Sequence, residues 1–242
     1  MDKEEIQKID AGFRRLVGRP IGREKQDADQ IYIPAFVTGF EYLISSGDFP
    51  GDVLEFGTYA GYSAHILAEV IQKSGLNSHL WLYDSFEGLP ASEYTNDTEC
   101  YLNKKGDWVA GGMSLPRGFD KYIEASLANI MPRTSFSIVK GFFEDTMDKK
   151  LTDKKAVLVH LDCDLYSSSK YVLEKLIAKD VLQDGTLLYC DDYNCNRGNL
   201  SMGQRGALSA VFNEKCRFSV SDFLSYGWAS KSFIIHDKEA VF

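Results

Sequence analysis

The chain of 242 residues is 44% hydrophobic and 26% charged, as expected of a globular domain, and its net charge of −8 argues against a nucleic-acid partner because phosphate binding relies on clustered lysine and arginine. No apolar stretch approaches the roughly 20 residues that span a bilayer, and the charged start lacks the apolar core of a signal peptide. Five cysteines without paired spacing favour a reduced, cytoplasmic compartment over a disulfide framework.

Two amphipathic helices are predicted ahead of the first strand. One covers residues 3–17, and the other runs from about residue 30 to residue 46. We expect a helical extension over residues 1–48 and a main domain over residues 49–242. Helices that precede the sheet also hint at self-association, so a homo-oligomer is an expectation to test.

The first strand is predicted over residues 52–56, with a glycine turn and a helix after it. Such a turn brings backbone N–H groups and a helix N-terminus against an anionic group. The spacing Glu55-x-Gly57-x-x-x-Gly61 differs from the dinucleotide fingerprint G-x-G-x-x-G. The next predicted strand, 80–83, ends in Asp84, where a ribose diol is usually held. The pattern predicts a cofactor that carries a nucleoside and needs no pyrophosphate cradle.

The periodic pattern is lost from residue 85 to residue 117, where glycines, prolines and aromatic residues gather. An insertion of this length in a compact domain is usually a lid or a disordered loop. Its aromatic residues favour a lid that closes on a substrate, and we place this lid at about residues 86–118. A helix over 119–131 and a strand over 135–139 are predicted next, and the strand ends near Gly141.

Four carboxylates belong to a predicted strand–helix–strand unit. The apolar runs 156–161 and 186–190 each predict a strand that is buried on both faces. The right-handed crossover makes these strands parallel, so their carboxyl ends share one edge of the sheet, where ligands of open α/β sheets bind. Four like charges at that edge would repel one another unless a cation lay among them. A divalent metal site is therefore predicted from Asp162, Asp164, Asp191 and Asp192.

Five motifs occur in an order that resembles a known family: EFGTYAGYS (55–63), YDSFEGLP (83–90), GFFEDT (141–146), DCDLY (162–166) and DDY (191–193). Together they resemble the macrocin-type (TylF-like) O-methyltransferases, S-adenosylmethionine-dependent enzymes that methylate sugar hydroxyls of natural products. The resemblance covers roughly residues 50–215, and the aspartate spacing is more distantly similar to the metal site of catechol-type methyltransferases. Cys163, where the family usually has glycine, and the turn residues 58–60 depart from the pattern.

The resemblance implies the class I methyltransferase fold, a Rossmann-like α/β sheet of seven mostly parallel strands with the last strand antiparallel and helices on both faces. It also implies S-adenosyl-L-methionine and Mg²⁺, or a similar divalent cation, as cofactors. By motif, the metal ligands would be Asp162, Asp191 and Asp192. The cofactor would be bound by Glu55, Gly57, Thr58, Tyr59, Gly61 and Ser63, by Asp84 and Ser85, by Gly141, Phe142 and Phe143, and by Asp162.

A free alcohol is a poor nucleophile near neutral pH, and this explains a metal site. A divalent cation with oxygen ligands can chelate two neighbouring hydroxyls and lower the pKa of the one that reacts, which predicts a vicinal diol or catechol as substrate. Asp162 and Asp164 are the candidate catalytic residues, since on an extended backbone both would point to one side and Asp164 could take the proton. Asp164 is equally a candidate cap for the helix that begins at Tyr166, and His236 is a weaker candidate base.

We therefore expect a metal-dependent O-methyltransferase that acts on a hydroxyl of a sugar or another small vicinal-diol metabolite of natural-product biosynthesis, with no nucleic-acid or membrane partner. A catechol-type acceptor is the first alternative. A non-catalytic binding module with the same fold is the second, and the presence of all three metal carboxylates argues against it.

Overall fold

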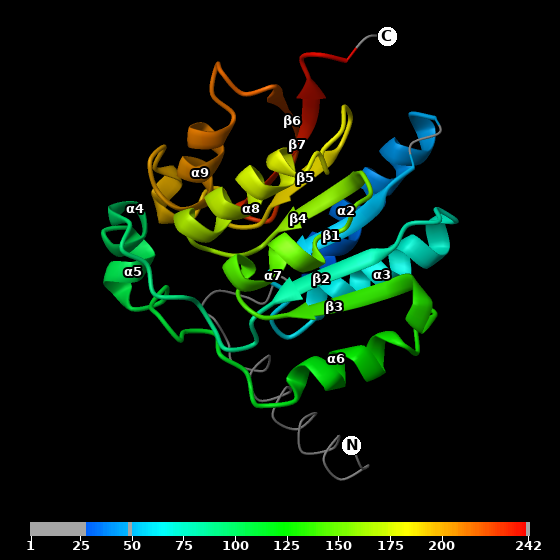
Figure 1. Cartoon of the computed structure of the whole chain (residues 1–242), viewed down its shortest axis with the longest axis horizontal. Helices are drawn as coiled ribbons and strands as arrows, with labels where there is room; N and C mark the ends of the chain where they lie inside the picture. The colour runs from blue at the N-terminus through cyan, green and yellow to red at the C-terminus, as the bar shows by residue number, and fades with distance from the viewer. Residues whose placement is uncertain (1–27, 48–49, 241–242) are drawn as a thin grey trace.

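The computed structural model describes residues 28–47 and 50–240, so the helix predicted over residues 3–17 lies outside the described residues. The described chain forms one seven-stranded sheet with helices packed on both faces (Figure 1). Its strands are β1 Asp52–Phe56, β2 Leu80–Asp84, β3 Phe136–Lys140, β4 Ala156–Leu161, β5 Leu187–Cys190, β6 Phe218–Tyr226 and β7 Ser230–Asp237. None of the described helices is long and apolar enough to cross a bilayer.

The order of the strands is β3-β2-β1-β4-β5-β7-β6. Neighbouring strands from β3 to β5 pair in parallel, while β7 pairs antiparallel with both β5 and β6. The last strand is thus antiparallel to the other six, which confirms the predicted fold class. The chain leaves β1 toward β2 on one side and returns to β4 on the other, so the strand order reverses between β1 and β4. Ligands of open α/β sheets bind at the carboxyl edge of such a reversal.

Eight helices of the described chain surround this sheet or join its strands. They are α2 Ala28–Ser45, α3 Tyr62–Ser74, α4 Thr95–Thr98, α5 Tyr101–Lys105, α6 Phe119–Leu127, α7 Phe143–Lys150, α8 Tyr166–Ala178 and α9 Gly203–Val211, with short 3-10 turns at Arg133–Ser135 and Asn196–Gly198. One hydrophobic core packs α2, α3 and α6 against the sheet, and a second packs α7, α8 and α9 against the opposite face.

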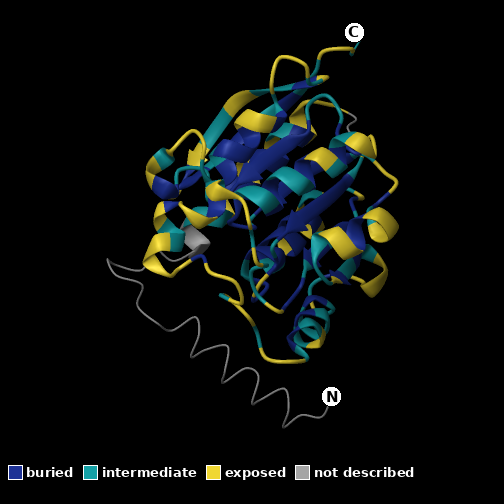
Figure 2. Cartoon of the chain, turned by 60° about the vertical axis from the view of Figure 1, so that its left-hand side comes forward, coloured by how far each residue is buried: buried dark blue, intermediate teal, exposed yellow. Residues whose placement is uncertain are grey.

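The central strands are the most deeply buried part of the molecule (Figure 2). Every residue of β1, β4 and β5 is buried, because helices cover both faces of the sheet. The buried polar residues Asp52, Glu55 and His160 hydrogen-bond to other protein groups. Phe36, Phe40 and Leu43 of α2 belong to the same hydrophobic core as α3, α6 and one face of the sheet. The second helix of the predicted extension therefore packs on the same sheet as the helices of the main domain.

The segment between β2 and α6 is more ordered than its sequence indicates. It contains α4 and α5, and it forms a small core of its own around Cys100 and Trp108, which pack with Leu165, Cys195 and Ala229. The expectation of a stretch without regular structure is wrong, because this small core holds the two short helices in place. Sequence periodicity also missed α7, which begins at Phe143 within the motif that follows β3.

Candidate active site

A cavity of about 250 Å³ opens at the carboxyl edge of the sheet, where the strand order reverses. Eight of the residues predicted to bind the cofactor line it: Gly57, Tyr59, Asp84, Ser85, Gly141, Phe142, Phe143 and Asp162. Leu89, Pro90 and Met113 from the segment predicted as a lid line it as well. Together with Asp191 and Asp192, these residues bring the carboxyl ends of the five strands β1 to β5 around one cavity, as the parallel topology predicts.

The turn after β1 is held close to the end of β4. A Cβ atom on Gly57 would lie only 1.7 Å from the backbone oxygen of Asp162, and the φ of Gly57 is 92°. Only glycine fits this approach, because any side chain would collide with the neighbouring backbone. The turn therefore brings its own backbone, with no side chain between, to the wall of the cavity beside Asp162.

Asp84 holds two turns together at the cavity wall. Its Oδ2 accepts a hydrogen bond from the backbone N–H of Tyr59 at 2.7 Å, and its Oδ1 accepts one from Phe86 at 2.6 Å. Burial raises the pKa of Asp84, and the hydrogen bonds from Tyr59 and Phe86 act in the opposite direction. Each carboxylate oxygen keeps a second lone pair, so Asp84 can still accept hydrogen bonds from a ligand in the cavity.

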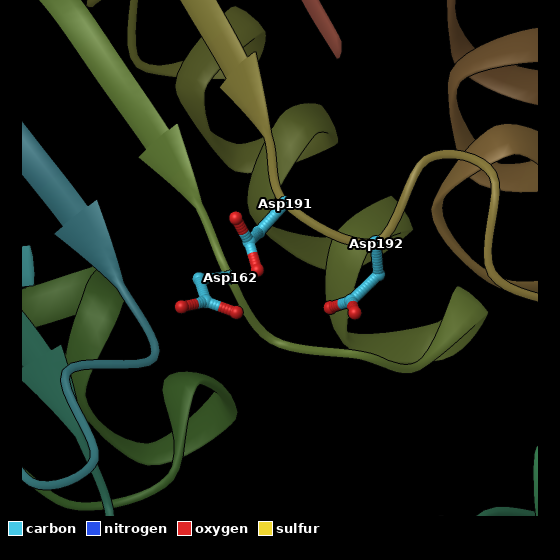
Figure 3. Close-up of side chains that lie close together, drawn as sticks. All are labelled: Asp162, Asp191 and Asp192. Atoms are coloured by element: carbon cyan, nitrogen blue, oxygen red, sulfur yellow. The ribbon is translucent and has the colours of Figure 1, made fainter. Parts of the chain in front are cut away.

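Three aspartates gather at the ends of β4 and β5 (Figure 3). Asp162 follows β4, Asp191 and Asp192 follow β5, and one carboxylate oxygen from each lies within 4.8 Å of the other two. All three line the cavity. The arrangement follows directly from the parallel pairing of the two strands, whose last paired residues are Leu161 and Cys190.

Burial and mutual repulsion oppose ionisation of this cluster. The pKa of Asp162 is raised well above its usual value, first by burial and then by the charges of Asp191 and Asp192. The pKa of Asp192 is raised to about 7, again by burial first and by Asp191 second. Carboxylates placed together in this way are stabilised by a bound cation, which relieves their repulsion.

Asp164 lines the same cavity, but the backbone there is not extended. Its φ is 59°, in the left-handed region, so the expectation that an extended backbone points Asp162 and Asp164 to the same side is wrong. Nor does Asp164 cap α8. The backbone N–H groups of Tyr166 and Ser167 donate instead to the carboxylate of Asp97, from α4. Burial, followed by the charges of Asp192 and Asp191, raises the pKa of Asp164 well above its usual value.

Four predicted cofactor-binding residues do not line the cavity: Glu55, Thr58, Gly61 and Ser63. Glu55 is fully buried within β1, where one oxygen pairs with Nδ1 of His160 at 3.0 Å. A Cβ on Gly61 would meet the side chain of Ile123, so Gly61 permits close packing of α3 against α6. The other candidate base, His236, lies six residues along β7 from Ser230, roughly 20 Å from the ligand edge.

Several residues outside the predicted motifs contact the aspartate cluster, and Ser230 and Gln204 are two of them. Ser230, at the start of β7, donates from its hydroxyl to the backbone oxygen of Asp191 at 2.7 Å and lies 3.1 Å from Oδ1 of the same residue. Gln204, in the first turn of α9, accepts a hydrogen bond from the backbone N–H of Asp192 at 2.9 Å. Neither could be found from the sequence, because each is brought to the cluster by tertiary packing and belongs to none of the five motifs.

The strand order and the cavity at its reversal define a class I methyltransferase fold. The O-methyltransferase NovP shares this fold, with 19% identity over 84% of this chain and 78% of that chain and a TM-score of 0.63. CalS11, described as a calicheamicin methyltransferase, shares it with 18% identity over 97% of this chain and 93% of that chain and a TM-score of 0.70. The Podospora anserina methyltransferase PaMTH1, described as bound to S-adenosylhomocysteine, has 13% identity over 99% and 97% of the two chains and a TM-score of 0.51.

Residues 40–204 match the family model of the macrocin O-methyltransferases (TylF), and the chain belongs to that family. The resemblance drawn from the five motifs is thus confirmed. No curated protein sequence matches the chain.

Proposed function

We propose that this protein transfers a methyl group from S-adenosylmethionine to a hydroxyl of a sugar or another vicinal-diol metabolite, with the help of a divalent cation. The observation that supports this proposal is the cluster of Asp162, Asp191 and Asp192 in the wall of the cavity. The methyl donor itself needs no metal, so a cation held by this cluster would act on the acceptor hydroxyl. Membership of an O-methyltransferase family fixes the acceptor atom as oxygen.

The residues of the cluster fit a hard divalent cation. Mg²⁺ and similar ions prefer carboxylate oxygens, and three are available within 4.8 Å of one another. Oδ2 of Asp192 is buried and has no hydrogen-bond partner among the described residues, which leaves it available for an ion. A cation held by these three residues would chelate two adjacent hydroxyls of the acceptor and make the reacting hydroxyl more acidic.

The remainder of the cavity fits the cofactor. The close backbone at Gly57 suits the amino-acid end, and Asp84 offers acceptor lone pairs to a ribose diol. Gly141, Phe142 and Phe143 bring an apolar, aromatic wall of the kind that packs against a planar base. The PaMTH1 structure, which has the same fold, is described as bound to the demethylated form of this cofactor.

Asp164 is the proposed base. It lines the cavity together with the three residues of the cluster. A carboxylate in a buried, acidic environment holds a proton more firmly than one in water, which suits the removal of a proton from an alcohol. Asp162 is proposed to contact both the cation and the cofactor.

Methyl transfer from isotopically labelled S-adenosylmethionine tests the proposal. The acceptors are a panel of sugars with vicinal diols, the matching sugars with one hydroxyl removed, and simple catechols. We expect transfer to diols that chelation removes and Mg²⁺ restores, with no transfer by Asp191→Ala. Transfer to catechols alone would identify the catechol-type alternative. Transfer at the same rate with a chelator, or by Asp191→Ala, would overturn the metal-dependent proposal.

A further inference from the structure

We infer that Gln204 is a positioning residue that sets the separation of the metal-binding aspartates at the ends of β4 and β5. The inference rests on the proposed function, since it concerns the same cation site. Gln204 is fully buried in the first turn of α9, and its side-chain amide lies between the two strand ends. It would act through Asp162 and Asp192 without contacting the reacting atoms.

The amide of Gln204 is bonded to both strands at once. Its Oε1 accepts from the backbone N–H of Asp192 at 2.9 Å, and its Nε2 donates to the backbone oxygen of Leu161 at 2.8 Å. The same oxygen of Leu161 accepts from the N–H of Asp191 at 3.1 Å. The side chain therefore takes the position of one more rung after the last backbone hydrogen bond between β4 and β5.

This link matters because the two strands part where the aspartates begin. Leu161 and Cys190 are the last paired residues of β4 and β5. The N–H of Asp162 is directed away from β5 and donates to Phe56 of β1 at 2.8 Å. Gln204 thus joins the peptide that leads into Asp162 to the backbone of Asp192, one residue beyond the backbone ladder.

A glutamine suits this position because one rigid planar group supplies both a donor and an acceptor. Methionine would fill the same space but leave the N–H of Asp192 and one acceptor position of Leu161 without their partner. Asparagine is shorter by one methylene and can reach one strand but not both. Glutamate would place a second acceptor against the oxygen of Leu161 and add a charge beside the aspartates.

A glycine at the start of α9 allows Gln204 to lie close to the ends of β4 and β5. The residue before it, Gly203, has a φ of 53°, and a Cβ there would lie 2.9 Å from Nδ2 of Asn196 and 3.4 Å from Trp108. A side chain at this position would collide with Asn196, so glycine allows α9 to begin this close to its neighbours. Groups that orient metal ligands through hydrogen bonds commonly change metal affinity by about 10- to 100-fold when they are removed.

Titration of Mg²⁺ into the full-length protein by calorimetry, in the presence of S-adenosylhomocysteine, tests this inference. We expect Gln204→Met to bind Mg²⁺ about 10- to 100-fold more weakly than wild type, and Gln204→Asn to bind with intermediate affinity. The matched control is Gln183→Met. Gln183 donates from Nε2 to Ala156 at 3.1 Å, at the opposite end of the same strand, so its removal should leave Mg²⁺ affinity unchanged.

The outcomes separate this inference from the function on which it rests. Wild-type protein that binds no Mg²⁺ would overturn the proposed metal site together with the role of Gln204. Wild-type binding with equal affinity in both Gln204 variants would overturn the role of Gln204 alone. Denaturation midpoints of the two methionine variants test whether Gln204 has a merely structural role. If Gln204→Met and Gln183→Met lose the same stability and the same Mg²⁺ affinity, the weaker binding follows from lost stability and the positioning role is wrong.

Discussion

The carboxylate of Asp97, in α4, accepts a hydrogen bond from the backbone N–H of Tyr166 at 2.6 Å and thereby caps the N-terminus of α8. Its second oxygen accepts from the N–H of Ser167 at 3.2 Å and from the hydroxyl of Ser92 at 2.6 Å. Helix α8 begins four residues after Asp162. The segment predicted as a lid is therefore tied to the helix that follows the aspartate cluster.

Loss of this cap should destabilise the protein. Asp97→Ala leaves two part-buried N–H groups of α8 without their partner, so we expect the free energy of unfolding to fall by about 2 kcal/mol. Urea denaturation followed by circular dichroism measures the change. Thr98→Ala, in the same short helix, is the control, because it removes a hydroxyl that donates to the backbone oxygen of Tyr94, the residue before α4. An equal effect of the two substitutions would show that Asp97 does not act as the cap.

The close approach at Gly57 should tolerate no side chain. Gly57→Ala combines an unfavourable backbone conformation with a collision against Asp162, and we expect a loss of stability of more than about 2 kcal/mol together with loss of cofactor binding. Gly75→Ala is the matched control, because Gly75 has a φ of 73° and open space around it. Thermal unfolding of the two variants separates the collision from the backbone strain. Equal midpoints would contradict the collision.

The aspartate cluster should make the metal-free protein less stable as pH rises. A carboxyl with a higher pKa in the folded state stabilises the fold while it is protonated. This stabilisation is at its full value below about pH 4, the ordinary pKa of an aspartate in the unfolded chain. For Asp192 it is lost as pH rises toward about 7, the pKa of this carboxyl in the folded protein. Thermal unfolding in a chelator should therefore show a midpoint that falls as pH rises from about 4 to about 7.

Mg²⁺ should reverse this loss at the upper end of the range, because the cation replaces the protons that the cluster gives up. Asp192→Asn should flatten the pH profile of the metal-free protein, since an amide does not ionise. A midpoint in wild type that does not respond to Mg²⁺ at about pH 8 would contradict the proposed site.

Asp84 should strengthen cofactor binding. Asp84→Asn replaces an acceptor oxygen with an NH₂ group, which meets either the N–H of Tyr59 or that of Phe86. We expect affinity for S-adenosylhomocysteine, measured by calorimetry, to fall by about tenfold or more, which corresponds to about 1.4 kcal/mol. Glu87→Gln, an exposed substitution in the same turn, should bind as wild type does. Unchanged affinity in Asp84→Asn would remove Asp84 from the cofactor site.

The parallel part of the fold could be predicted from the sequence because its signals are local. The strands β4 and β5 are nearly continuous apolar runs followed by aspartate, β1 is followed by a glycine turn, and their order along the chain fixes which ends meet. The gathering of Asp162, Asp191 and Asp192 follows from that topology alone. For the same reason, the five motifs around the strand ends were sufficient to indicate the family.

The remainder depends on contacts between distant parts of the chain. Helix α4 has four residues, and its place is fixed by Asp97 at the start of α8 and by the small core around Trp108. The left-handed backbone at Asp164 leaves no periodic mark in the sequence. Gln204 reaches the aspartates from α9, and a lone glutamine at the start of a helix carries no signal of its own.

The central claim is that Asp162, Asp191 and Asp192 hold a divalent cation beside a methyl-donor cofactor. Calorimetric titration of S-adenosylmethionine and of Mg²⁺ into wild type and into Asp191→Ala tests it most directly. We predict cofactor binding in both proteins and Mg²⁺ binding in wild type alone. If Asp191→Ala binds Mg²⁺ as wild type does, the carboxylates are structural and the claim is wrong. If neither protein binds the cofactor, the cavity has been assigned to the wrong ligand.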